Sequence, residues 1–186
     1  EALCRRAVRG ATHVFHLASS YQFPGLKRSG ALAKIVNGWA VNSIVTWQSG
    51  FPFSVSSGLD NAFTGTGGQR ADFLGGTPAL SSSRSHAEMI ARWFDVTLFT
   101  TNALGTFGNS GKNILRAPRL FNTDFSAIKS TKLTERASLQ FRAEFFNFFN
   151  NVNFGGPNST VTSATFGRIT SARDPRILQG ALKLIF

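Results

Sequence analysis

Strict alternation of apolar and polar residues constrains this chain more than any other feature. Within ERASLQFRAEF (residues 135–145), every odd-numbered position from Ala137 to Phe145 is apolar, and the even-numbered positions carry Arg, Ser, Gln or Glu. Successive side chains of a β-strand point to opposite faces, so this period of two predicts a strand with one apolar and one polar face. The same pattern predicts strands at residues 12–23, 37–55, 120–129, 135–145 and 176–186. The sequence therefore predicts an all-β, antiparallel protein.

Two architectures use such strands, and the connections favour one of them. A soluble β-sandwich buries the apolar face, whereas a transmembrane β-barrel turns it toward lipid. The connections alternate in length: 24–36 and 131–134 are short, and 58–117 and 148–175 are long. Outer-membrane barrels join their strands by short periplasmic turns and long extracellular loops. The order predicts a meander from a transmembrane barrel with two extracellular loops, and a soluble carbohydrate-binding sandwich remains the alternative.

Composition is compatible with a membrane barrel. Hydrophobic residues make up 42% of the 186 residues and charged residues 16%, which argues against disorder. No apolar run approaches the length of about 18 residues that a transmembrane helix needs. Trp39 and Trp47 share one face of a predicted strand and suit two aromatic girdles. The expected location is the outer membrane of a Gram-negative bacterium.

Charge and motifs give no sign of catalysis. The formal charge of +11 comes from scattered Lys and Arg, without a compact basic run, so we expect contact with anionic lipid headgroups or lipopolysaccharide rather than with nucleic acid. GNSGKN (108–113) lacks the spacing of a phosphate-binding loop, and GTGGQR (65–70) is typical of a flexible turn. His13 and His16 would lie on opposite faces of a strand, and Cys4 is the single cysteine. We expect no enzyme activity, no metal and no cofactor.

Four long segments resemble one known family. They are GWAVNSIVTWQSGFPFSV (38–55), GTFGNSGKNILRAPRLFNTDFSAIK (105–129), LTERASLQFRAEFFNFFNNVNFGGPN (133–158) and FGRITSARDPRILQGALKLIF (166–186). In this order they resemble the C-terminal part of TonB-dependent-receptor-like outer-membrane proteins, of the Oar-like, carboxypeptidase-regulatory-like and acidobacterial type. The resemblance implies a barrel of about 22 strands with an N-terminal plug, which takes up a solute with energy delivered through TonB.

Two parts that the resemblance implies are not found in this sequence. It contains no plug and no TonB box, and five strands are too few to enclose a plug, so we expect the chain to be a C-terminal fragment of a larger protein. TonB would then act through an N-terminal region outside this sequence, and the solute stays unnamed. The alternative within the membrane class is a barrel that does not transport, such as an adhesion or surface protein.

Two sets of residues become candidates for function. The ending QGALKLIF resembles the final strand that the barrel-assembly machinery recognises, which implies roles for Gly180, Leu182, Leu184 and Phe186. A strand with an unpaired edge suits such recognition by strand addition. The polar faces predict a second set that lines the lumen and contacts plug or solute, or else serves hydration and pairing between strands. That set is Asn42, Gln48, Asp124, Gln140, Arg142 and Glu144.

Overall fold

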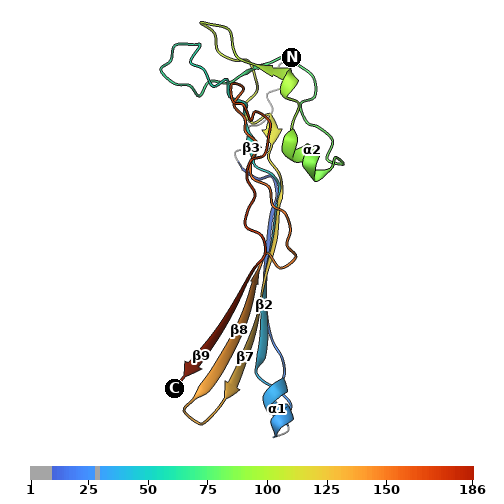
Figure 1. Ribbon diagram of the computed structural model, residues 1–186, viewed down its shortest axis with the longest axis vertical. Helices are drawn as coiled ribbons and strands as arrows, with labels where there is room; N and C mark the ends of the chain where they lie inside the picture. Colours follow the sequence, from blue (N-terminus) through green and yellow to red (C-terminus); the bar gives the residue numbers. More distant parts are fainter. Residues whose placement is uncertain (1–9, 28–29) are drawn as a thin grey trace. The chain divides into compact units, whose positions relative to one another are not determined.

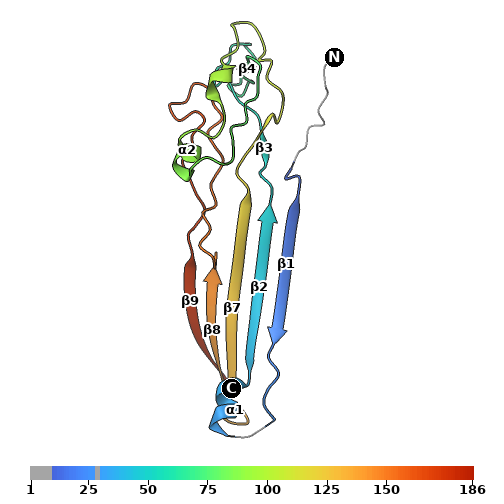
Figure 2. The same ribbon diagram turned by 90° about the vertical axis from the view of Figure 1, so that its right-hand side faces the viewer.

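The computed structural model describes residues 10–27 and 30–186, and five long strands form its main sheet. These strands are antiparallel neighbours in the order β1-β2-β7-β8-β9 (Figure 2). Their bounds are β1 Val14–Gln22, β2 Trp39–Gln48, β7 Leu120–Lys132, β8 Ser138–Phe146 and β9 Ile177–Ile185. Each long strand pairs with the next long strand along the chain, so the sheet is a meander. The all-β antiparallel fold predicted from the sequence is confirmed, and the sheet is open, as expected for an incomplete barrel.

The described chain divides into two compact units. One, the strand unit, comprises Val14–Trp47, Phe121–Val152 and Asp174–Phe186. The other, the loop unit, comprises Gln48–Leu120 and Asn153–Arg173 together with residues 10–13. The loop unit thus collects the two long connections of the meander.

The register of the strand unit separates two faces. Phe141 of β8 lies between Lys129 of β7 and Leu182 of β9, and Ala143 lies between Ala127 and Gly180. On the other side of the sheet, Glu144 lies between Ser126 and Gln179. We name the first side the apolar face and the second the polar face.

The short connections of the strand unit are fixed by polar contacts. The β7–β8 turn is closed by a bond from the Leu133 N–H to the carbonyl of Ala137 (2.9 Å), and the Thr134 hydroxyl accepts the Ala137 N–H (3.0 Å). Between β1 and β2 the chain forms α1 (Ala31–Val36). Lys129, on the apolar face, donates from Nζ to the carbonyls of Lys34 (2.8 Å) and Asn37 at the end of α1, with Nζ 5.6 Å from the centre of the Trp39 ring. Its ammonium group is thereby satisfied beside an otherwise apolar surface.

The loop unit has a hydrophobic core of its own. Its short elements are β3 Pro52–Phe53, β4 Asp72–Phe73, α2 His86–Ala91, the 3-10 helix η1 Val96–Leu98, β5 Phe99–Thr100 and β6 Leu115–Arg116 (Figure 1). β3 pairs with β6, and β4 pairs with β5. The buried core is Val55, Ala71, Phe94, Phe99 and Leu115. Phe94 is only 1% exposed and meets the rings of Phe53, Phe99 and Phe166.

The structure corrects several boundaries. β2 ends at Gln48 instead of continuing to Val55, and Pro52 and Phe53 form the separate strand β3. Between them Gly50 lies so close to the main chain of Ala117 that a side chain would not fit there. β7 runs three residues past the predicted end at 129, and β8 begins at Ser138 rather than at 135. The connections 58–117 and 148–175 also contribute to one packed unit, where the sequence indicated plain loops. Of the helices in the described residues, none is long and apolar enough to cross a bilayer.

Candidate functional site

The polar face brings together three of the predicted lumen residues. Asn42 of β2 donates from Nδ2 to the Ser126 hydroxyl of β7 (3.2 Å), and Ser126 is paired with Glu144 of β8. Asn42, Asp124 and Glu144 line one hollow of the strand unit, together with Ser126 and with the apolar residues Ile44, Phe125, Phe145 and Phe146. Alternation in three adjacent strands therefore gathers residues that are far apart in the sequence.

The carboxylates of this hollow are held by neighbours. Asp124 accepts from the Asn122 side-chain amide (2.8 Å) and from the Asn147 N–H (3.0 Å). Glu144 faces Arg142, with 3.5 Å between the carboxylate oxygen and the guanidinium nitrogen. These contacts fix the direction of each group while leaving other oxygen lone pairs for water or a solute.

The other three predicted residues occupy different places. Gln140 lies along β8 from the hollow and reaches the Ser130 hydroxyl (3.3 Å). Arg142 lies between Gln140 and Glu144 on the same face but does not line the hollow. Gln48 belongs to the loop unit, where it lines a separate pocket with residues such as Phe51 and Arg119.

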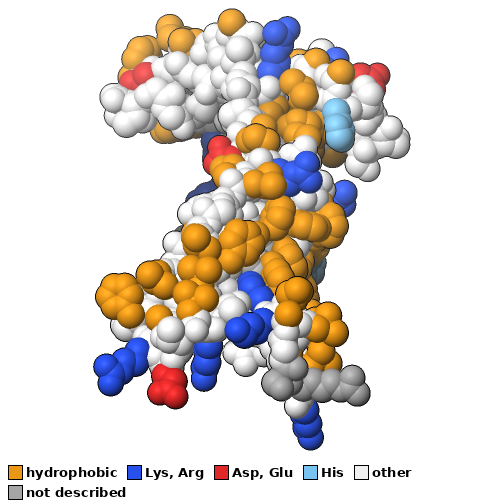
Figure 3. Space-filling model, turned by 60° about the horizontal axis from the view of Figure 1, so that its bottom comes forward, with side chains coloured by type: hydrophobic (Ala, Val, Ile, Leu, Met, Phe, Trp, Pro, Cys, Tyr) orange, Lys and Arg blue, Asp and Glu red, His pale blue; other side chains and the backbone are white. Residues whose placement is uncertain are grey.

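The apolar face is exposed over β8 and β9. Leu182 is 67% exposed and Leu184 is 52% exposed, although both lie against apolar residues of β8. Gly180 lies opposite Ala143, and Phe186 follows the last residue of β9. An aromatic group of Phe125, Phe145 and Phe148 continues this face, with ring centres 5.4–6.2 Å apart. In Figure 3, hydrophobic side chains gather over the lower part of the view, and Lys and Arg side chains, with an acidic one among them, lie at its lower edge.

The comparison with protein families accounts for the exposed apolar face of the sheet. Residues 8–179 match the family model described as an outer membrane beta barrel domain. The chain belongs to this outer membrane β-barrel family. No curated protein and no solved structure matches the chain.

Membership assigns an environment to each face of this outer-membrane β-barrel domain. The protein resides in the outer membrane, where a barrel turns its apolar face toward lipid and its polar face toward the lumen. Exposure of the apolar side chains of β9 is then burial in hydrocarbon.

The described residues offer few side chains suited to a metal site. Among residues 10–27 and 30–186, no group of three or more His, Cys, Asp or Glu side chains is placed to hold a metal ion. His16 is hydrogen-bonded through Nδ1 to the Thr46 hydroxyl (3.1 Å), and Cys4 lies outside the described residues. The β-barrel surface thus offers hydrogen bonds and charges.

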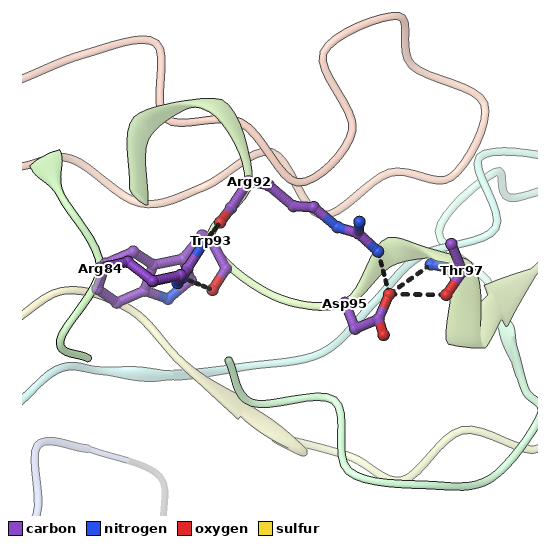
Figure 4. A network of polar contacts seen from close by, with 5 residues as sticks. All are labelled: Arg84, Arg92, Trp93, Asp95 and Thr97. Atoms are coloured by element: carbon purple, nitrogen blue, oxygen red, sulfur yellow. Dashed lines mark hydrogen bonds and ion pairs between the residues drawn. The ribbon is translucent and has the colours of Figure 1, made fainter. Parts of the chain in front are cut away.

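In the loop unit, carboxylates are satisfied by neighbouring donors. The Thr97 hydroxyl lowers the pKa of Asp95 below its ordinary value, and the Thr97 N–H and Arg92 add to the effect. Figure 4 shows Arg92 and Thr97 converging on Asp95, while Arg84 is directed at the carbonyls of Arg92 and Trp93. The N–H of Thr64 likewise lowers the pKa of Asp60, with help from Gly65 and Gln69.

Two features were missed from the sequence. Ser85 and Glu88 form a reciprocal cap at the start of α2, and the Ser85 hydroxyl lowers the pKa of Glu88. The sequence SHAE (85–88) carries the capping-box spacing and could have revealed this helix. The pocket around Gln48 has no comparable signal, because its walls come from three separate segments.

Proposed function

We propose that this β-barrel domain is part of an outer-membrane receptor that takes up a solute with energy supplied through TonB. The observation that supports the proposal is the polar face of the strand unit, where Arg142 and Glu144 form an ion pair and Glu144 lies opposite Gln179. Small barrels fill their interiors with packed side chains, whereas wide barrels keep a polar lumen for a channel or a plug. The resemblance of the segments 38–55, 105–129, 133–158 and 166–186 to TonB-dependent-receptor-like proteins supports the same proposal.

In this mechanism different parts of the chain would have different roles. The loop unit would meet the solute outside the cell, and the hollow at Asn42, Asp124 and Glu144 would exchange hydrogen bonds with a plug or with the passing solute. Gly180, Leu182, Leu184 and Phe186 would present β9 to the barrel-assembly machinery. Strand addition suits that step, because β9 is the last strand in the order of the described sheet.

A non-transporting surface barrel is the second candidate. The loop unit exposes large apolar side chains: Phe63 is 71% exposed, Leu104 73% and Phe107 70%. Their segments are joined by a bond from the Gly105 N–H to the Asn61 carbonyl (2.6 Å). Apolar side chains at loop tips suit contact with another surface rather than capture of a small polar solute.

Whole-cell uptake separates the two candidates. The full-length protein would be expressed in cells with and without TonB and supplied with a labelled siderophore, oligosaccharide or peptide. Transport predicts accumulation that needs TonB and that falls when Asp124→Asn and Glu144→Gln are combined, with unchanged barrel assembly. Equal accumulation of every label with and without TonB would reject transport in favour of a surface role.

A further inference from the structure

A pocket of the loop unit has walls from three segments. One segment runs from Gln48, the last residue of β2, to Phe51, and another runs from Ala117 to Leu120, the first residue of β7. The third consists of residues 154–156, which lie with Arg173. The side chains and backbone that matter most here are those of Gln48, Phe51, Arg119, Phe154, Gly156 and Arg173.

Backbone pairing fixes these walls. The Ala117 N–H donates to the Phe51 carbonyl (2.9 Å), directly beside the β3–β6 pair. On the other side, Phe154 pairs with Ala172, and the Arg173 N–H donates to the Asn153 carbonyl (2.8 Å). Each of these two walls of the pocket is therefore held by backbone hydrogen bonds to a neighbouring segment.

The charge of the pocket is positive and uncompensated. Arg119 and Arg173 line it, and none of its lining residues carries a carboxylate. In residues 10–27 and 30–186 the ion pairs are Arg92–Asp95 and Arg142–Glu144, and neither includes Arg119 or Arg173. A third guanidinium, that of Arg116, donates to the Gly50 carbonyl next to the same wall (3.1 Å).

The acidic residues of the loop unit are occupied elsewhere. Asp60 and Asp95 accept from their own turns, and the Glu88 carboxylate accepts from the N–H and the hydroxyl of Ser85 at the start of α2. Asp72 accepts the Asn109 N–H (2.9 Å). These local bonds leave the arginines of the pocket without a protein anion.

We propose that this pocket binds a phosphate-type oxyanion attached to an apolar body. Guanidinium groups bind phosphate through paired charge-assisted hydrogen bonds, and the Gln48 amide adds a neutral donor. Gly156 has open space where a side chain would project, so an anion can approach its backbone. Phe51 and Phe154 provide apolar contact beside the charged groups.

Two sources carry this chemistry: the phosphates of lipopolysaccharide and a soluble phosphorylated solute. The proposal does not depend on transport, because binding to the purified protein tests it alone. The full-length protein in detergent would be titrated with lipid A micelles and, separately, with phenyl phosphate. Binding of micelles alone identifies the lipid source, and binding of phenyl phosphate identifies the soluble source.

Matched variants connect binding to the pocket. Arg119→Gln combined with Arg173→Gln should weaken binding of the active ligand by at least about tenfold, since two charge-assisted contacts are lost. Arg168→Gln is the control: it removes one positive charge, as each of the two pocket substitutions does, from an exposed position of the loop unit outside the pocket. It should change the affinity less than about twofold. Arg119→Lys keeps the charge and should retain part of the affinity.

Two results would overturn the proposal. One is wild-type protein that binds neither ligand, and the other is a double variant that binds as tightly as Arg168→Gln. Heat-modifiable electrophoresis verifies that each variant is folded. If the double variant is unfolded, the comparison of Arg119→Lys and Arg119→Gln carries the test, and equal affinity in these two would reject a role for the charge.

Discussion

Replacement of Phe94 by Ala tests whether the long connections form a packed unit. Phe94 is 1% exposed, and its ring centre lies 5.4–5.8 Å from those of Phe53, Phe99 and Phe166. Buried Phe→Ala changes cost about 3–5 kcal/mol, which includes lost transfer energy and the remaining cavity. Three aromatic pairs place Phe94 toward the upper half of that range, so we expect a loss of about 4 kcal/mol, or about a thousandfold rise in the open fraction of the loop unit.

Protease digestion of intact cells measures this opening. Cleavage of a transiently open segment follows the open population when reclosure is fast, so Phe94→Ala should be cut in the loop unit far faster than wild type. Phe107→Ala is the matched control, because Phe107 is 70% exposed and outside the core. If both variants are cut at the same rate, the loop unit lacks the core described above.

Three further perturbations test other parts of the structure. Phe141→Arg, on the apolar face, should lower the stability of the assembled barrel in urea by about 2–4 kcal/mol. Gln140→Arg, on the polar face, should be tolerated. Equal losses of stability in the two variants would contradict the assignment of faces. The lowered pKa of Asp95 means that its carboxylate stabilises the loop unit above pH 3.8 and loses this effect as the pH falls further. Hydrogen-exchange protection of the loop unit, taken relative to the intrinsic exchange rate at each pH, should therefore fall at pH 3. Asp95→Asn should remove that component, and an unchanged pH dependence would argue against it. A Cβ at Gly50 would overlap the facing main chain, so Gly50→Ala should reduce protease resistance while Gly111→Ala should not; a harmless Gly50→Ala would show that the close approach is not required.

The alternation of apolar and polar residues was sufficient to predict the sheet and the face on which a strand residue lies. A period of two needs only local sequence, and once antiparallel neighbours are assumed it places Asn42, Asp124 and Glu144 on one face. In the structure Asn42 donates to the Ser126 hydroxyl, and Ser126 is paired with Glu144. The role of these residues in binding stays a prediction.

The loop unit could not be predicted in the same way. Its core residues Val55, Phe94 and Leu115 follow no helical or strand period, and they meet through short two-residue strands. Sequence gives no register for such pairs, because each is set by the packing of the whole unit. The pocket of Arg119 and Arg173 depends on the same long-range contacts and was therefore invisible.

The pairing of β3 with β6 has a consequence for how the barrel wall forms. β2 and β7 are neighbours in the sheet, yet residues 49–119 separate them. Closing a disordered segment of that length costs about 2–3 kcal/mol more than closing a tight turn, since each doubling adds about 0.6 kcal/mol. Once Pro52 has met Arg116, the two ends of the segment are already joined, and the search for the β2–β7 register becomes that of a short hairpin. Folding of the loop unit would thus set the rate at which β2 and β7 find each other.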